Sequence, residues 1–195
     1  MFRLATVLLL SPTLFAAPIT VTSYTAPAGD PGSFTYQDTG GTELTDGLYG
    51  VIPFGDQTQA DPWIGWLLGN HSNPLLTFNF GGPVNITQVD LDLARWGSAL
   101  IFLPASIDIG GTLFPLTGTE LADSTRGTLS FAVNFVGVSS LNIQLTHGGT
   151  YLFLDEAKFF GSAAGGVPEP GSAILGGLGL CALAIVRRRV RRSQP

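Results

Sequence analysis

Short runs in which apolar and polar residues alternate follow one another along the middle of this chain. A period of two places successive side chains on opposite faces of an extended strand. Gly, Pro and Asn residues separate the runs, and no convincing helical period is found between residues 20 and 161. The pattern predicts at least six strands, at Leu76–Phe80, Val89–Leu93, Ser106–Ile109, Leu129–Phe135, Leu141–Leu145 and Tyr151–Phe160.

Six or more such strands predict an all-β fold, an antiparallel β-sandwich of the jelly-roll type, over residues 18–161. The first run is expected to end at the turn Gly81–Pro83. On the second run Asp90 and Asp92 share the polar face, roughly 6–7 Å apart. Carboxylates at this spacing can do acid–base chemistry on a sugar. On a solvent-facing strand they also keep a sheet soluble, and this is the role that we expect.

The N-terminal end has the pattern of a secretory signal peptide. Arg3 supplies a positive charge, an apolar run covers Leu4–Phe15, and cleavage is expected near the small residues Ala16 and Ala17. The apolar run is too short for a membrane span, and the alternative is a buried first strand. We assign residues 1–17 to a signal peptide and expect export through the Sec translocon.

The C-terminal end has three parts in a fixed order. A linker with a Pro-Glu-Pro segment covers 162–172, an apolar run covers 173–186, and an arginine-rich tail covers 187–195. As a helix the apolar run would be roughly 21 Å long, short for a hydrocarbon core of about 30 Å. The arginines would stay on the cytoplasmic side. The sequence therefore predicts a short transmembrane helix after an extended segment that a protease can reach.

This order resembles the PEP-CTERM sorting signal. The resemblance implies that an exosortase-type membrane protease recognises an inner-membrane-anchored precursor and cleaves it near the Pro-Glu-Pro motif. It also implies a Gram-negative cell that makes exopolysaccharide, and a mature protein in the cell envelope, at the surface or outside the cell. The alternative is a membrane anchor that is never processed. The residues of the sorting motif are Val167, Pro168, Glu169 and Pro170.

Charge is distributed unevenly along the chain. Its net charge is -5, but most of the basic residues lie in the C-terminal tail. Between residues 18 and 166, three basic and thirteen acidic residues leave a net charge of about -10. So acidic a body repels phosphate backbones, which excludes nucleic-acid binding. The single cysteine, Cys181, excludes an internal disulfide and a thiolate metal cluster.

The body has a second resemblance, to discoidin or galactose-binding-like domains. It is carried by Glu43–Gly47, Trp63–Trp66, Leu76–Gly81, Ile86–Val89 and Phe153–Gly161. The resemblance implies a β-sandwich with a structural calcium ion, held by Asp46, Glu156 and backbone carbonyls. In the alternative, Asp46 only stabilises its own turn and Glu156 is a solvated strand residue.

Aromatic residues between Gly47 and Asn73 are the candidate ligand contacts. Tyr49, Trp63 and Trp66 offer flat apolar faces on which a sugar ring can stack, although the tryptophans can equally belong to the core. No Gly-x-Ser-x-Gly, His-Glu-x-x-His or phosphate-binding glycine motif occurs. We therefore expect a non-catalytic binding or matrix-associated module that contacts exopolysaccharide. The alternatives are a polysaccharide hydrolase of the envelope and a purely structural matrix protein.

Overall fold

The structure is a computed structural model that describes residues 16–30, 36–38, 40–50 and 63–164. Nearly all of the predicted signal peptide lies outside the described residues. The sorting motif, the predicted transmembrane helix and the arginine tail lie outside them as well. Within the described ranges, no helix is long and apolar enough to cross a membrane.

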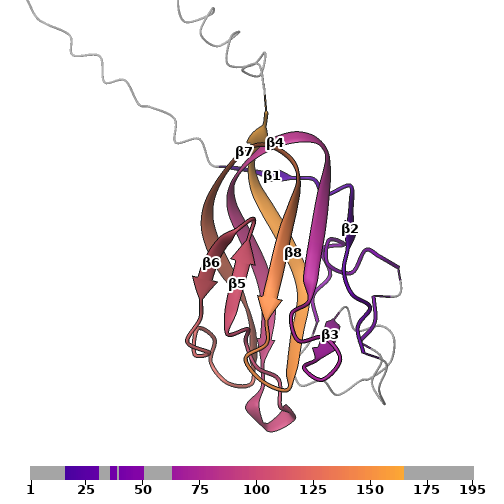
Figure 1. Ribbon diagram of the computed structural model, residues 1–195, viewed down its shortest axis with the longest axis vertical. Coiled ribbons are helices and arrows are strands. Elements are labelled where there is room, and N and C mark those ends of the chain that lie inside the picture. The colour runs from indigo at the N-terminus through magenta and orange to yellow at the C-terminus, as the bar shows by residue number, and fades with distance from the viewer. Residues whose placement is uncertain (1–15, 31–35, 39, 51–62, 165–195) are drawn as a thin grey trace, which may run out of the picture. The chain divides into compact units, whose positions relative to one another are not determined.

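Antiparallel strands dominate the described part of the chain (Figure 1). All six predicted runs lie within strands, so the prediction of an antiparallel all-β fold is confirmed. The short strands β1, β2, β3 and β6 were not predicted. In chain order the elements are β1 (Ala17–Ile19), β2 (Ser23–Thr25), β3 (Ile64–Leu67), β4 (Leu75–Arg95), the 3-10 turn η1 (Gly97–Ala99), β5 (Ser106–Ile109), β6 (Thr112–Pro115), β7 (Thr125–Thr146) and β8 (Tyr151–Ala163).

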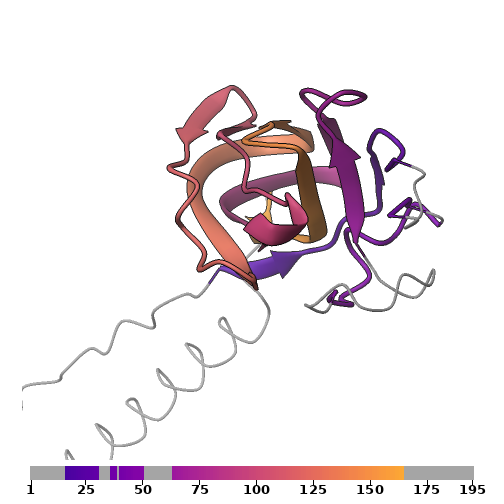
Figure 2. The same ribbon diagram turned by 90° about the horizontal axis from the view of Figure 1, so that it is seen from below.

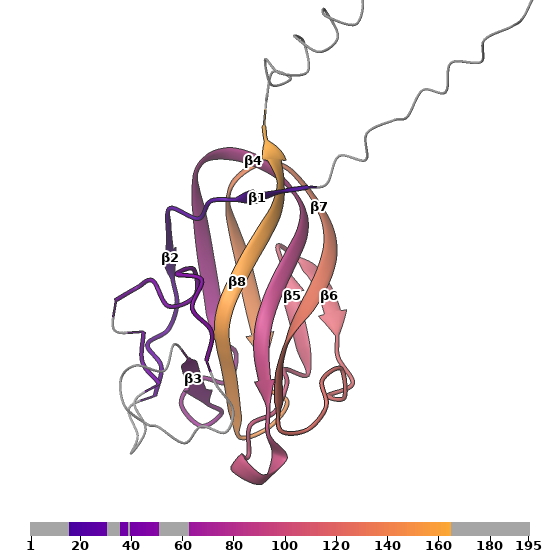
Figure 3. The same ribbon diagram turned by 180° about the vertical axis from the view of Figure 1, so that it is seen from behind.

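Two strands are far longer than expected, because each joins two of the predicted runs. β4 has 21 residues and β7 has 22. The turn predicted at Gly81–Pro83 was wrong, since β4 continues through it with register shifts against β7 between Asn79 and Gln88. Gly81 has a φ of 71° and Gly137 on β7 a φ of 66°, which glycine adopts without strain. Both strands bend here and remain paired on either side (Figures 1 and 3).

The bent strands let one continuous sheet fold back on itself as a sandwich. Its strand order is β1-β8-β4-β7-β5-β6, with β2 paired to β4 and β3 paired to β8. Figure 2 shows the sheet wrapped around its interior. Apolar side chains from the long strands fill this interior, among them the fully buried Leu76, Phe78 and Phe159.

A second, smaller apolar cluster lies apart from this main core. It contains the buried residues Trp63, Ala94, Ile101 and Phe153, with Tyr36 packed against it. The rings of Tyr36 and Phe153 have their centroids 4.5 Å apart. Residues before β3 therefore pack on part of β8 and β4, on the side away from the main core. The candidate functional site lies where this segment meets β8.

Candidate functional site

The loop of residues 43–50 is fixed to the middle of β8. Leu44 is fully buried. Its carbonyl accepts a hydrogen bond of 2.8 Å from the Ala157 amide, and its own amide donates to the Tyr24 hydroxyl at 3.1 Å. The 43–50 loop thus continues the hydrogen bonding of β8 and brings Asp46 and Tyr49 to that strand.

The alternation of β8 slips by one residue under this loop. Leu154 and Ala157 both pack in the main core, although three positions separate them. Consequently Asp155 and Glu156 are both available to the 43–50 loop rather than lying on opposite faces. The Glu156 carboxylate accepts the Gly47 amide at 2.8 Å. The Asp155 carboxylate accepts the Gly50 amide, also at 2.8 Å.

Basic residues bind the buried carboxylates of this region. The Arg126 guanidinium lies 3.2 Å from Asp155 Oδ2 and 3.2 Å from Asp92 Oδ1. Lys158 Nζ lies 3.6 Å from Asp92 Oδ2, and the Thr128 hydroxyl donates to Asp92 Oδ1 at 2.6 Å. Strands β4, β7 and β8 thus join in one charge network. The solvent-facing role expected for Asp92 was wrong, because this residue is only 2% exposed.

Burial changes the proton affinity of the two acids on β8. It raises the pKa of Asp155 to about 7, against the opposing effects of the Gly50 amide and the Arg126 charge. Burial also raises the pKa of Glu156 to about 7, and the negative charges of Asp46 and Asp155 add to the rise. Both carboxyls therefore change their protonation state near neutral pH.

Tyr49 is the predicted ligand contact that remains accessible. This residue is 42% exposed. The Arg126 guanidinium carbon lies 4.1 Å from the ring centroid, and Lys158 Nζ lies 4.3 Å from it. Such cation–π contacts hold the ring against the charge network. Tyr49 therefore presents an orientated aromatic group at the edge of the site.

The two predicted tryptophans lie in the interior instead. Trp63 and Trp66 are both 0% exposed. Trp66 Nε1 donates to the Pro27 carbonyl at 3.0 Å, and Trp63 packs beside Phe153 with ring centroids 6.1 Å apart. Because both indoles are fully buried, neither presents a face to a ligand. The stacking role predicted for these two residues does not fit this geometry.

The structure brings together the two residues predicted to bind calcium. Glu156 contacts the turn that follows Asp46, and a pocket of about 450 Å³ is lined by both residues together with parts of β1 and β8. Asp46 Oδ1 also accepts the Leu48 amide at 2.8 Å, as in the alternative interpretation of a self-stabilised turn. Two hard carboxylates beside backbone carbonyls suit calcium chemically. The described residues contain no cluster of three or more His, Cys, Asp or Glu that could hold a metal ion. The calcium site therefore stays a prediction.

Sequence reasoning missed Asp92, Asp155, Arg126 and Lys158 as members of one site. Two signals were present in the sequence. Arg126 and Lys158 are two of the three basic residues between positions 18 and 166. Asp155 and Glu156 are adjacent acids in a strand whose other residues, apart from Lys158, are mostly apolar or aromatic. Such rare charges inside an apolar strand indicate paired, buried groups.

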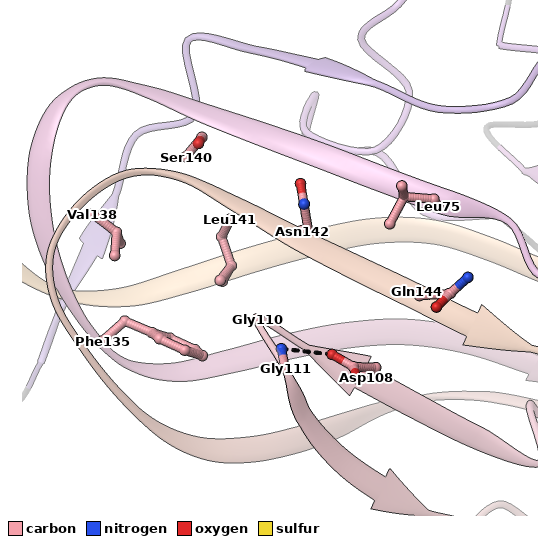
Figure 4. A pocket seen from close by; sticks show the side chains of 10 residues that line it. All are labelled: Leu75, Asp108, Gly110, Gly111, Phe135, Val138, Ser140, Leu141, Asn142 and Gln144. Carbon is pink, nitrogen blue, oxygen red and sulfur yellow. Dashed lines mark hydrogen bonds between the residues drawn. The ribbon is translucent and has the colours of Figure 1, made fainter.

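A second pocket, also of about 450 Å³, lies where the β5–β6 turn meets β7 (Figure 4). Asn142 and Gln144 of β7 line it with polar groups, and Leu75 and Phe135 supply apolar ones. Asp108 also lines it, and its Oδ1 accepts the Gly111 amide at 2.7 Å. This pocket shares no residue with the site around Tyr49.

The C-terminal end of the chain matches a known protein family. Residues 166–192 match the family described as the PEP-CTERM protein-sorting motif. The predicted sorting signal is thereby confirmed, and it indicates an exported protein whose precursor is processed by an exosortase. No curated protein matches the chain.

Solved structures resemble the body at low sequence identity, and the first of them has its fold. The F5/8 type C domain of a Bacteroides fragilis protein matches with a TM-score of 0.50 and 10% identity, over 78% of this chain and 99% of that chain. A structure of Streptococcus pneumoniae β-galactosidase BgaA matches with a TM-score of 0.49 and 10% identity, over 76% and 99%. CpGH89CBM32-5 from Clostridium perfringens, in complex with GalNAc-β-1,3-galactose, matches with a TM-score of 0.44 and 13% identity, over 70% and 93%. The chain therefore combines a discoidin-like β-sandwich with a PEP-CTERM protein-sorting motif.

Proposed function

We propose that this protein is a non-catalytic module of the cell envelope that contacts the exopolysaccharide of the cell that produces it. The observation that carries the proposal is the sorting motif at 166–192, because it directs the body to the compartment where this polymer accumulates. In this proposal the Sec translocon exports the chain, the apolar run 173–186 anchors the precursor in the inner membrane, and exosortase releases the sandwich.

The arrangement of the buried acids supports binding rather than hydrolysis. Glycoside hydrolysis needs two carboxyl groups that reach the scissile bond of a sugar. Asp92 and Asp155 are at most 2% exposed, and Arg126 bridges them. Their charges hold β4, β7 and β8 together beneath the 43–50 loop, so they serve the fold in this arrangement.

Intact mass spectrometry of the protein from its native host tests the sorting step. We expect a mature form that lacks the residues beyond the 167–170 region, and a full-length form when Pro168 and Pro170 are both replaced by alanine. A full-length wild-type protein in the membrane fraction would contradict release and leave an unprocessed anchor.

Binding is tested separately with the purified exopolysaccharide of the host. We expect the protein to sediment with this polymer without releasing new reducing ends. Release of reducing ends would favour the hydrolase alternative. Absence of both binding and cleavage would favour a structural matrix protein without a ligand.

A further inference from the structure

The outer face of β2, β4, β7 and β5 has a regular polar surface that the proposed function does not yet use. The register places side chains from neighbouring strands in rows across this face. Together these rows form what we call the amide face. One row is Ser23, Asn79 and Ser140; the second is Thr25, Thr77 and Asn142; the third is Leu75, Gln144, Asp108 and Leu113; the fourth is Thr146, Ser106 and Pro115.

Much of the hydrogen-bonding capacity of the amide face is unused. On β7 the inward residues are buried, whereas Ser140, Asn142, Gln144 and Thr146 are all exposed. Ser140, Gln144 and Thr146 have no side-chain hydrogen-bond partner within the described ranges of the chain. Asn142 accepts the Thr77 hydroxyl at its Oδ1 at 2.9 Å, which orientates the amide and leaves its nitrogen to donate. The amide of Asn142, held by Thr77, and the amide of Gln144, unpartnered among the described residues, can both bind hydroxyl groups of a sugar.

The pocket of Figure 4 opens on the amide face and adds apolar surface to it. Leu75 is 46% exposed, and Phe135 lines the same pocket. At the β5–β6 turn a Cβ at Gly110 would lie 2.7 Å from the Phe135 ring, so Gly110 packs closely against that ring, whereas a Cβ at Gly111 would have nothing within 4 Å. A pyranose ring has an apolar C–H side and a polar edge. Leu75 and Phe135 offer apolar contacts for the C–H side of the ring. Asn142 and Gln144 offer hydrogen bonds for its polar edge.

The charge of the amide face and of the surrounding body limits the class of polysaccharide that can bind. Asp108 is the single charged member of the four rows, and it is an acid. The surrounding body carries a net charge of about -10 between residues 18 and 166, so a polyanionic glycan would be repelled. We infer that the amide face binds an uncharged polysaccharide chain. This inference rests on the proposed function and deepens it by naming the contact surface and the polymer class.

Affinity electrophoresis tests the inference with defined polymers. The purified protein is run in native gels that contain galactomannan, xyloglucan or β-1,3-glucan, with an alginate gel as the anionic comparison and the host exopolysaccharide in a further gel. The test variant is Asn142→Ala with Gln144→Ala. The matched control is Ser130→Ala with Asn134→Ala, two exposed residues of β7 on the other side of the Gly137 bend. Tyr49→Ala reports on the other site, and thermal unfolding verifies that each variant is folded.

We expect retardation by at least one neutral polymer, about tenfold weaker in the test variant and unchanged in the control, since two hydrogen bonds are lost. In ¹⁵N NMR spectra, oligosaccharides of that polymer should shift the side-chain amide signals of Asn142 and Gln144. Binding that survives in the test variant but not in Tyr49→Ala would overturn the inference and leave glycan binding intact.

Three other results would also overturn the inference. Retardation by alginate alone would contradict the polymer class. A wild-type dimer that the test variant converts to a monomer, with retardation unchanged, would show that a second copy covers the amide face. No retardation by any polymer, the host exopolysaccharide included, would contradict glycan binding itself, and the proposed function would fail with it.

Discussion

Replacing Asp155 with asparagine is expected to flatten the pH dependence of stability. Burial raises the pKa of this carboxyl from 3.8 to about 7, and its Oδ1 has no hydrogen-bond partner among the described residues. The folded protein therefore holds this proton more tightly than the unfolded chain does. Between about pH 4 and pH 7 the folded state binds more protons, so the free energy of unfolding falls as the pH rises. Over the whole interval the titration of Asp155 lowers the free energy of unfolding by about 4 kcal/mol.

Glu156 changes stability in the same direction, because burial raises its pKa to about 7 as well. The titration of both groups should therefore lower the free energy of unfolding of the wild-type protein between pH 5 and pH 8. Asparagine at position 155 keeps an oxygen that can accept the Gly50 amide but cannot ionise. The variant should lose roughly half as much free energy over this range as the wild type does.

Urea unfolding at pH 5, 6, 7 and 8 measures the effect. The fluorescence of Trp63 and Trp66 reports unfolding, because both indoles are fully buried in the folded protein. Asp90→Asn is the control, since Asp90 is partly exposed on β4 and lies outside the charge network. Its profile should follow that of the wild type. Equal slopes for Asp155→Asn and the wild type, or a wild-type stability that rises towards pH 8, would refute the reasoning.

Three further predictions concern the same region. Arg126→Met should lower the free energy of unfolding by about 3 kcal/mol at pH 8, because two buried carboxylates lose their shared partner. Arg95→Met is the control: it removes a hydrogen bond to a backbone carbonyl and should lower the free energy of unfolding by about 1 kcal/mol. Equal decreases for the two variants in urea titrations would contradict the charge network. Gly50→Ala should destabilise by about 1–3 kcal/mol in thermal unfolding, because its Cβ would lie 1.9 Å from Trp63 Nε1. A calcium site at Glu156 predicts that millimolar calcium raises the Tm of the wild type but not of Glu156→Gln; an unchanged wild-type Tm would count against it.

The sequence alone determined the fold class and the destination of the protein. A period-two pattern is a local property, so the strands at Ser106–Ile109 and Tyr151–Phe160 could be predicted without knowledge of their partners. The sorting signal is likewise a linear motif that an enzyme reads along the chain. Local pattern did not distinguish a turn from a bulge at Gly81, because both need a residue that tolerates a positive φ.

Only the tertiary structure decided which polar groups are buried and which are presented. Asp92 looks like an ordinary solvent-facing residue in the strand pattern, yet it is buried beside Arg126, against which Tyr49 packs from a loop more than 40 residues earlier. The sequence left Trp63 open between a ligand contact and a core residue, and its packing against Phe153 and Gly50 places it in the interior. The amide face depends on register, which aligns Thr77 with Asn142 across two strands. Burial and pairing depend on contacts between distant segments, and a local pattern contains no information about them.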